Sequence, residues 1–90
     1  MSEQDYMPIA CAMHEHYQYA VMKRALLDLC WLTQAGPVRQ ARVLPRDVCT
    51  RDGAEYLCVE TREGEAIEIR LDRITQAYWA ADGTNLDPSG

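Results

Sequence analysis

The sequence predicts a mainly β fold, in which one N-terminal helix precedes a small barrel or sandwich of about five strands. Three observations lead to this prediction. The chain has 90 residues, which suits a single domain. Short stretches that alternate apolar and polar residues recur between turn signals in the last two thirds of the chain. One stretch near the N-terminus instead has the spacing of an amphipathic helix.

The helix is expected over residues 12–23, which read AMHEHYQYAVMK. Helical spacing places four side chains on one face: Met13, Tyr17, Ala20 and Val21. Residues 1–9 are expected to be extended, because Pro8 disfavours helix for the residue before it.

Two strands are expected between the helix and Pro45. In the first, alternation places Leu27, Leu29 and Trp31 on one face and Leu26, Asp28, Cys30 and Leu32 on the other. The pair Gly36-Pro37 breaks the chain after it. Residues 38–44 alternate less regularly, and Pro45 is expected to end this second strand. Residues 46–54 are then a connection, in which Asp52-Gly53 is a turn signal between strands.

The stretch EYLCVETREGEAIEIRLDRI predicts a hairpin over residues 55–74 that turns at Gly64. Its inward-facing residues are expected to be Leu57, Val59, Ile67, Ile69 and Leu71. A last strand follows over residues 73–79. The single domain is therefore expected to span residues 1–79, and the composition of residues 80–90 predicts a flexible tail. A sheet this small is expected to bend into a barrel or sandwich, because closure protects its edges and encloses a core.

The net charge of −5 is unevenly distributed. Residues 1–22 hold three acids and no Lys or Arg, and residues 52–90 hold nine acids against three Arg. The overall acidity disfavours direct binding to nucleic acid, which requires many cationic contacts with phosphates. Residues 23–51 are basic and keep an alternative open, an RNA-binding module. The path of the bound RNA backbone would be lined by four arginines, Arg39, Arg42, Arg46 and Arg51. These arginines could equally pair with neighbouring acids.

Residues with catalytic or metal-binding chemistry are sparse. Cys11, His14 and His16 have C-x2-H-x-H spacing, but on a helix His16 would point away from the other two. No second ligand pair completes a tetrahedral site, so no metal or other cofactor is expected. The carboxylates near Gly64 surround an exposed turn, where the pKa shifts that acid–base catalysis needs are not expected. A metal- or thiol-dependent enzyme is therefore the least favoured hypothesis.

The start of the chain, MSEQDYMPIA, lacks the features of a signal peptide, and no apolar run is long enough for a membrane span. We therefore expect a cytoplasmic protein whose four cysteines are reduced thiols. Cys30 and Cys58 fall inside predicted strands, where they are expected to be small packing residues.

Four short segments carry a similarity to a known family. They are YMPIACAMHEHYQYA (residues 6–20), LLDLCW (26–31), RDGAEYLCVE (51–60) and IRLDRI (69–74). Tyr-x-Pro-Ile-x-Cys, Glu-Tyr-Leu and Arg-Leu-Asp-x-Ile are fairly specific as a set, although each alone is weak. Together the segments resemble the Rof family, small bacterial inhibitors of the transcription terminator Rho, and the similarity runs over about residues 6–75.

This resemblance implies an N-terminal helix and an Sm-like β-barrel that binds the Rho hexamer near its primary RNA-binding site. Such binding keeps RNA off Rho and reduces termination. We expect the free chain to be a monomer. The partner-binding residues are expected to be His14, Glu15, His16, Tyr17, Gln18, Glu60, Glu63 and Glu65.

The helix departs from the family in its charge. Family members carry a markedly acidic helix, whereas Ala12, Met13 and Gln18 stand here where acids are expected. Binding to Rho is therefore expected either to be weaker here or to depend more on His14, His16 and Tyr17, or on the hairpin.

Overall fold

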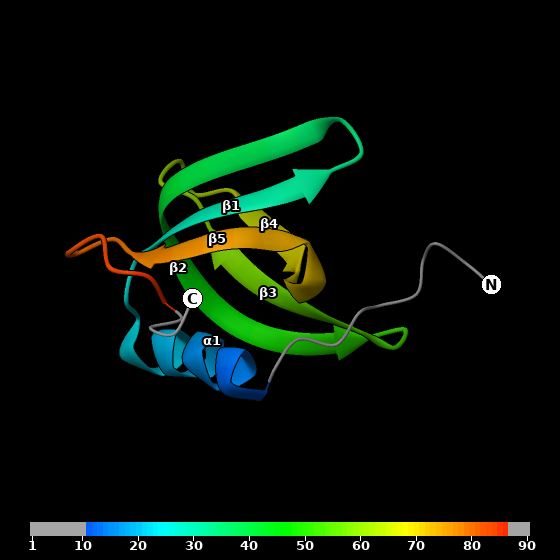
Figure 1. The fold of residues 1–90 in the computed structure, drawn as a ribbon, viewed down its shortest axis with the longest axis horizontal. Coiled ribbons are helices and arrows are strands. Elements are labelled where there is room, and N and C mark those ends of the chain that lie inside the picture. Colours follow the sequence, from blue (N-terminus) through cyan, green and yellow to red (C-terminus); the bar gives the residue numbers. More distant parts are fainter. Residues whose placement is uncertain (1–10, 87–90) are drawn as a thin grey trace.

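One helix and five antiparallel strands form the part of the chain that the computed structural model describes, residues 11–86 (Figure 1). The elements are α1 (Cys11–Lys23), β1 (Leu27–Thr33), β2 (Gly36–Arg51), β3 (Ala54–Glu60), β4 (Ala66–Arg70), the 3-10 turn η1 (Leu71–Arg73) and β5 (Ile74–Trp79). The strands form one sheet in the order β4-β3-β2-β1-β5. The predicted mainly β fold with an N-terminal helix is confirmed; the expected extended segment, residues 1–9, lies outside the described residues.

The long strand β2 connects the two halves of the sheet. Residues 36–43 pair with β1, whereas residues 44–51 pair with β3. In Figure 1, β2 is the green ribbon that curves from the top of the molecule to its base. Because each half of β2 has its own partner strand, the curve turns the sheet around an interior that β1, β3 and β5 also line.

The prediction that Pro45 ends a strand was wrong. Pro45 is fully buried inside β2, at the point where β2 leaves β1 and pairs only with β3. The ladder with β3 is irregular between Pro45 and Asp47, so a residue without an N–H group is tolerated there. Residues 46–51, which we expected in a connection, instead continue β2 to the predicted turn at Asp52-Gly53.

A second irregularity in β2 is held by Asp28. Leu27 faces Val43 and Leu29 faces Gln40, so two residues of β2, Ala41 and Arg42, lie opposite the single residue Asp28. Arg42 adopts a left-handed backbone conformation with φ of 57°, and its N–H donates to Oδ1 of Asp28 at 2.8 Å. The carboxylate thus replaces the ladder acceptor that this N–H lacks.

The core contains the predicted inward residues of the hairpin and the face of β1 on which alternation places Leu27, Leu29 and Trp31. Leu27, Leu29, Leu57, Val59, Ile69 and Leu71 are all at most 2% exposed, and Trp31 is 7% exposed. The helix packs its apolar face against the same core, with Tyr17 and Ala20 buried and Met13 and Val21 partly buried. Ile67 is partly buried at the edge of this cluster.

The chain after β5 folds back on the sheet, so the flexible tail predicted from Ala80 is wrong for residues 80–86. Leu86 is 1% exposed in the core, and its N–H donates to the carbonyl of Ala77 at 2.8 Å. Asp82 closes the turn by accepting hydrogen bonds from the backbone and side chain of Thr84. These bonds hold the pKa of Asp82 below its usual range. The folded unit therefore extends at least to Leu86, and residues 87–90 lie outside the described part.

Leu86→Ala is expected to lower the free energy of unfolding by about 2–5 kcal/mol, because it leaves a cavity in the core. Urea denaturation measures the change. The matched control is Leu32→Ala, since Leu32 lies on β1 and is 47% exposed. Equal losses for the two variants would show that residues 80–86 contribute nothing to the core.

Asp28→Ala is expected to lower the free energy of unfolding by about 0.5–1.5 kcal/mol, the net contribution of one hydrogen bond. Asp28→Asn keeps a side-chain oxygen that can accept from the Arg42 N–H, so this variant should lower the free energy of unfolding by less. If Ala and Asn give the same denaturation midpoint, the hydrogen bond does not stabilise the irregularity in β2.

Candidate functional site

The outward side of α1 carries a continuous exposed row of side chains. Glu15, Gln18, Tyr19 and Met22 follow the i, i+3, i+4, i+7 spacing of one helix face, opposite the face that packs on the core. We call these four residues the outer stripe. Tyr19 is 52% exposed and Met22 is 79% exposed, and they are two of the three large apolar residues exposed in the described part of the chain.

Tyr19 is held in position at the centre of the outer stripe. Its ring meets the ring of Trp79 edge to face, with centroids 6.1 Å apart and an interplanar angle of 89°. The Nζ atom of Lys23 lies 5.7 Å from the centroid of the same ring. A tyrosine fixed in this way offers a partner apolar area with little further loss of side-chain entropy.

The structure separates the helix residues that the sequence predicted as partner contacts. Glu15 and Gln18 are exposed on the outer stripe, and His16 is half-buried. Tyr17 is 3% exposed and belongs to the core, so its predicted role as a contact was wrong. The reason is that Tyr17 lies on the apolar helix face, together with Ala20.

His14 contacts the sheet instead of standing free. Its Nε2 lies 3.0 Å from a carboxylate oxygen of Glu55, at the start of β3. This contact ties the first turn of α1 to the β2–β3 turn. The Cys11–His14–His16 spacing considered for a metal is only partly described, because the side chain of Cys11 lies outside the described residues.

The predicted acidic residues of the hairpin lie at the other end of β3. Glu63 and Glu65 are exposed in the turn between β3 and β4. Thr61 holds this turn, since its N–H donates to the Glu65 carbonyl at 2.8 Å and its Oγ1 accepts from the Glu65 N–H at 3.1 Å. β3 has 7 residues and spans roughly 20 Å. The helix residues and the turn acids therefore form two separate patches.

Two of the four arginines considered for RNA binding are paired with acids of the hairpin. Arg46 contacts Glu60 at 3.0 Å. Arg51 donates hydrogen bonds to Glu68 from both terminal nitrogens, from Nη1 to Oε2 at 3.0 Å and from Nη2 to Oε1. This hydrogen-bonded pair holds the pKa of Glu68 below its usual range and raises that of Arg51. The four arginines thus do not form an unneutralised row along β2.

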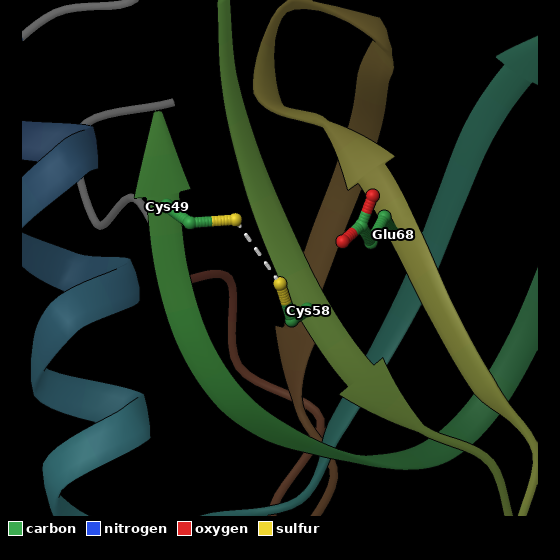
Figure 2. A group of neighbouring side chains, drawn as sticks. All are labelled: Cys49, Cys58 and Glu68. Atoms are coloured by element: carbon green, nitrogen blue, oxygen red, sulfur yellow. Dashed lines mark hydrogen bonds between the residues drawn. The ribbon is translucent and has the colours of Figure 1, made fainter. Parts of the chain in front are cut away.

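A cluster of two thiols and a carboxylate lies on the outward face of the sheet (Figure 2). Cys49 comes from β2, Cys58 from β3 and Glu68 from β4, and one ligand atom from each lies within 4.8 Å of the others. The two Sγ atoms are 3.3 Å apart. Burial, reinforced by the hydrogen bond with Cys49, raises the pKa of Cys58 to about 12. We call these three residues the thiol–carboxylate cluster.

Sequence reasoning missed this cluster because it ended β2 at Pro45 and placed Cys49 in a connection. The signal that could have found it is the turn at Asp52-Gly53. A two-residue turn pairs Arg51 with Ala54 and therefore Cys49 with Tyr56. Cys58 then lies two residues further along β3, on the same face and diagonal to Cys49.

Two further findings bear on the class of protein. Within residues 11–86, no helix has both the length and the apolar character that a membrane crossing requires. No protein-family model matches the chain, and a search of the curated proteins finds no match.

Proposed function

We propose that this chain is a protein-binding inhibitor of the transcription termination factor Rho. It docks near the primary RNA-binding site of Rho, blocks the loading of RNA and reduces termination. The observation that carries the proposal is the outer stripe of α1, an exposed row that combines a carboxylate with two large apolar side chains. The proposal also rests on the resemblance of residues 6–75 to the Rof family.

The charge of the chain suits a basic partner. Surfaces that bind RNA are rich in Arg and Lys, and an acidic protein can offer carboxylates to the same groups. With a net charge of −5, the chain is attracted to such a surface at long range, which speeds encounter. The lifetime of the complex then depends on a few packed anchors, and Tyr19 and Met22 are the large apolar side chains exposed on the part of α1 whose side chains the structure describes.

The alternative of an RNA-binding module is less well supported by the geometry. Arg46 and Arg51 are engaged with Glu60 and Glu68, so binding phosphates there would require breaking two ion pairs. Arg39 and Arg42 are exposed on the half of β2 that pairs with β1. Two arginines are few for binding that depends on phosphate contacts.

The proposal is tested by transcription in vitro with purified Rho and a template that carries a Rho-dependent terminator. Adding the chain is expected to increase read-through with dose, and a template with a Rho-independent terminator serves as the control. A gel shift with single-stranded RNA alone should show no retention. Unchanged read-through at a large excess over Rho hexamer, or retention of RNA by the chain itself, would contradict the proposal.

Glu15→Lys is expected to speed dissociation from Rho, because it puts a cation on the outer stripe opposite a basic surface. The comparison variant is Glu63→Lys, which changes the net charge equally but lies in the second predicted patch, at the far end of β3. Both variants should slow association to a similar degree, because both weaken the long-range attraction. Surface plasmon resonance separates the two rates. If Glu15→Lys leaves the dissociation rate unchanged, the outer stripe is not the contact, and faster dissociation of Glu63→Lys alone would place the contact at the β3–β4 turn.

Binding to Rho is also expected to weaken as the salt concentration rises from about 50 to 300 mM. Exposed charge pairs are screened over a Debye length of roughly 10 Å near 0.1 M salt. The dissociation constant measured across this series should rise mainly through a slower association rate. Binding that does not respond to salt would exclude a charge-led encounter.

A further inference from the structure

We propose that the thiol–carboxylate cluster of Cys49, Cys58 and Glu68 is a binding site for a thiophilic divalent metal ion, with Zn²⁺ as the best-fitting species. This inference does not depend on the proposed interaction with Rho, because the cluster lies on β2, β3 and β4 and shares no residue with the outer stripe.

The geometry brings three ligand atoms together from three neighbouring strands. The two Sγ atoms and one carboxylate oxygen lie within 4.8 Å of one another, and all three side chains project from the same face of the sheet (Figure 2). Hydrogen-bonded strands hold the positions from which these side chains project. The site therefore requires no folding of a loop around the ion.

The spacing of the two thiols is close to what a zinc ion needs. Zn–S bonds of about 2.3 Å at a tetrahedral angle place two thiolate sulfurs about 3.8 Å apart. The Sγ atoms are 3.3 Å apart. Their distance must therefore increase by about half an ångström to admit the ion, which small side-chain rotations can supply. On binding, each thiol releases its proton to solvent and both sulfurs bind as thiolates.

The ligand types select the class of metal. Thiolates favour borderline and soft ions such as Zn²⁺ over Mg²⁺ and Ca²⁺, which prefer oxygen ligands. Three protein ligands leave a fourth position for water or an external ligand. Because Cys49 and Cys58 are half-buried and Glu68 is exposed, this open position faces solvent.

Arg51 completes the surroundings of the site. It donates hydrogen bonds to both carboxylate oxygens of Glu68, and its guanidinium carbon lies 4.6 Å from the centroid of the Tyr56 ring. One oxygen of Glu68 can bind the metal while the other keeps its bond to Arg51, an arrangement that orients metal ligands in many proteins. The charges of the ion, two thiolates, Glu68 and Arg51 then sum to zero.

The test uses the full chain, freed of metal and kept reduced with a phosphine. Titration with Co²⁺ is expected to give a thiolate-to-metal charge-transfer band in the near ultraviolet that saturates at one ion per chain. Zn²⁺ should abolish the band by displacing Co²⁺ and should raise the melting temperature. Mg²⁺ should do neither.

Variants locate the site. Cys49→Ser and Cys58→Ser should each weaken Co²⁺ binding by more than 100-fold, whereas Cys30→Ser, which changes a thiol of β1 outside the cluster, should have no effect. Glu68→Gln should weaken binding about 10-fold or more. Its matched control is Glu60→Gln, because Glu60 is also paired with an arginine but lies outside the cluster.

A measurement on the unmodified chain keeps the test independent of variant folding. Zn²⁺ should protect Cys49 and Cys58 from alkylation, as mapped by mass spectrometry, and should leave Cys30 reactive. The proposal is overturned if Co²⁺ gives no band, if the Cys49→Ser/Cys58→Ser double variant keeps the band, or if Zn²⁺ protects Cys30 as strongly as the cluster. It is also overturned if the reduced chain forms a Cys49–Cys58 disulfide in the presence of Zn²⁺ as readily as without it.

Discussion

The curvature of β2 is the constraint on which the rest of the structure depends. One strand of 16 residues pairs with β1 along its first half and with β3 along its second, so the sheet must turn where the partner changes. Pro45 lies at this point, where β2 has no partner in β1 and the ladder with β3 is irregular, so its missing N–H costs no regular ladder bond. Asp28 holds the neighbouring irregularity by accepting from Arg42. The turn creates the interior that α1 covers, and it directs the second half of β2 so that Cys49 reaches Cys58.

The sequence predicted the parts of this fold that depend on local periodicity. Helical spacing grouped the apolar face of α1, and alternation identified the inward residues of β3 and β4 and placed Leu27, Leu29 and Trp31 of β1 on one face. The errors share a different cause, which is that pairing between distant segments overrode a local signal. A proline interrupts a ladder only where the neighbouring strand would accept its missing N–H, and the irregular pairing at Pro45 removes that need. Residues 80–86 have the composition of a tail, but Leu86 packs in the core. The thiol–carboxylate cluster was missed for the same reason, because it follows from the register across the Asp52-Gly53 turn.

Ion pairs within the molecule also determine which of its charges are available to a partner. The sequence suggested an acidic hairpin and a basic segment as separate features, but Arg46 and Arg51 neutralise Glu60 and Glu68. The carboxylates that stay exposed without such a cation include Glu15 on α1 and Glu63 and Glu65 in the β3–β4 turn. Of these, only Glu15 lies beside exposed apolar side chains. This combination of charge and apolar area makes the outer stripe the surface best suited to a protein partner.

The most direct test of the central claim is competition for RNA on Rho itself. Labelled single-stranded RNA is bound to the purified hexamer at low salt, the chain is titrated in, and fluorescence anisotropy reports how much RNA stays bound. We expect the anisotropy to fall to the value of free RNA as the chain saturates Rho, and we expect Glu15→Lys to require a higher concentration. Anisotropy that stays at the bound value throughout the titration would contradict the claim that this acidic surface occupies the RNA-binding region of Rho.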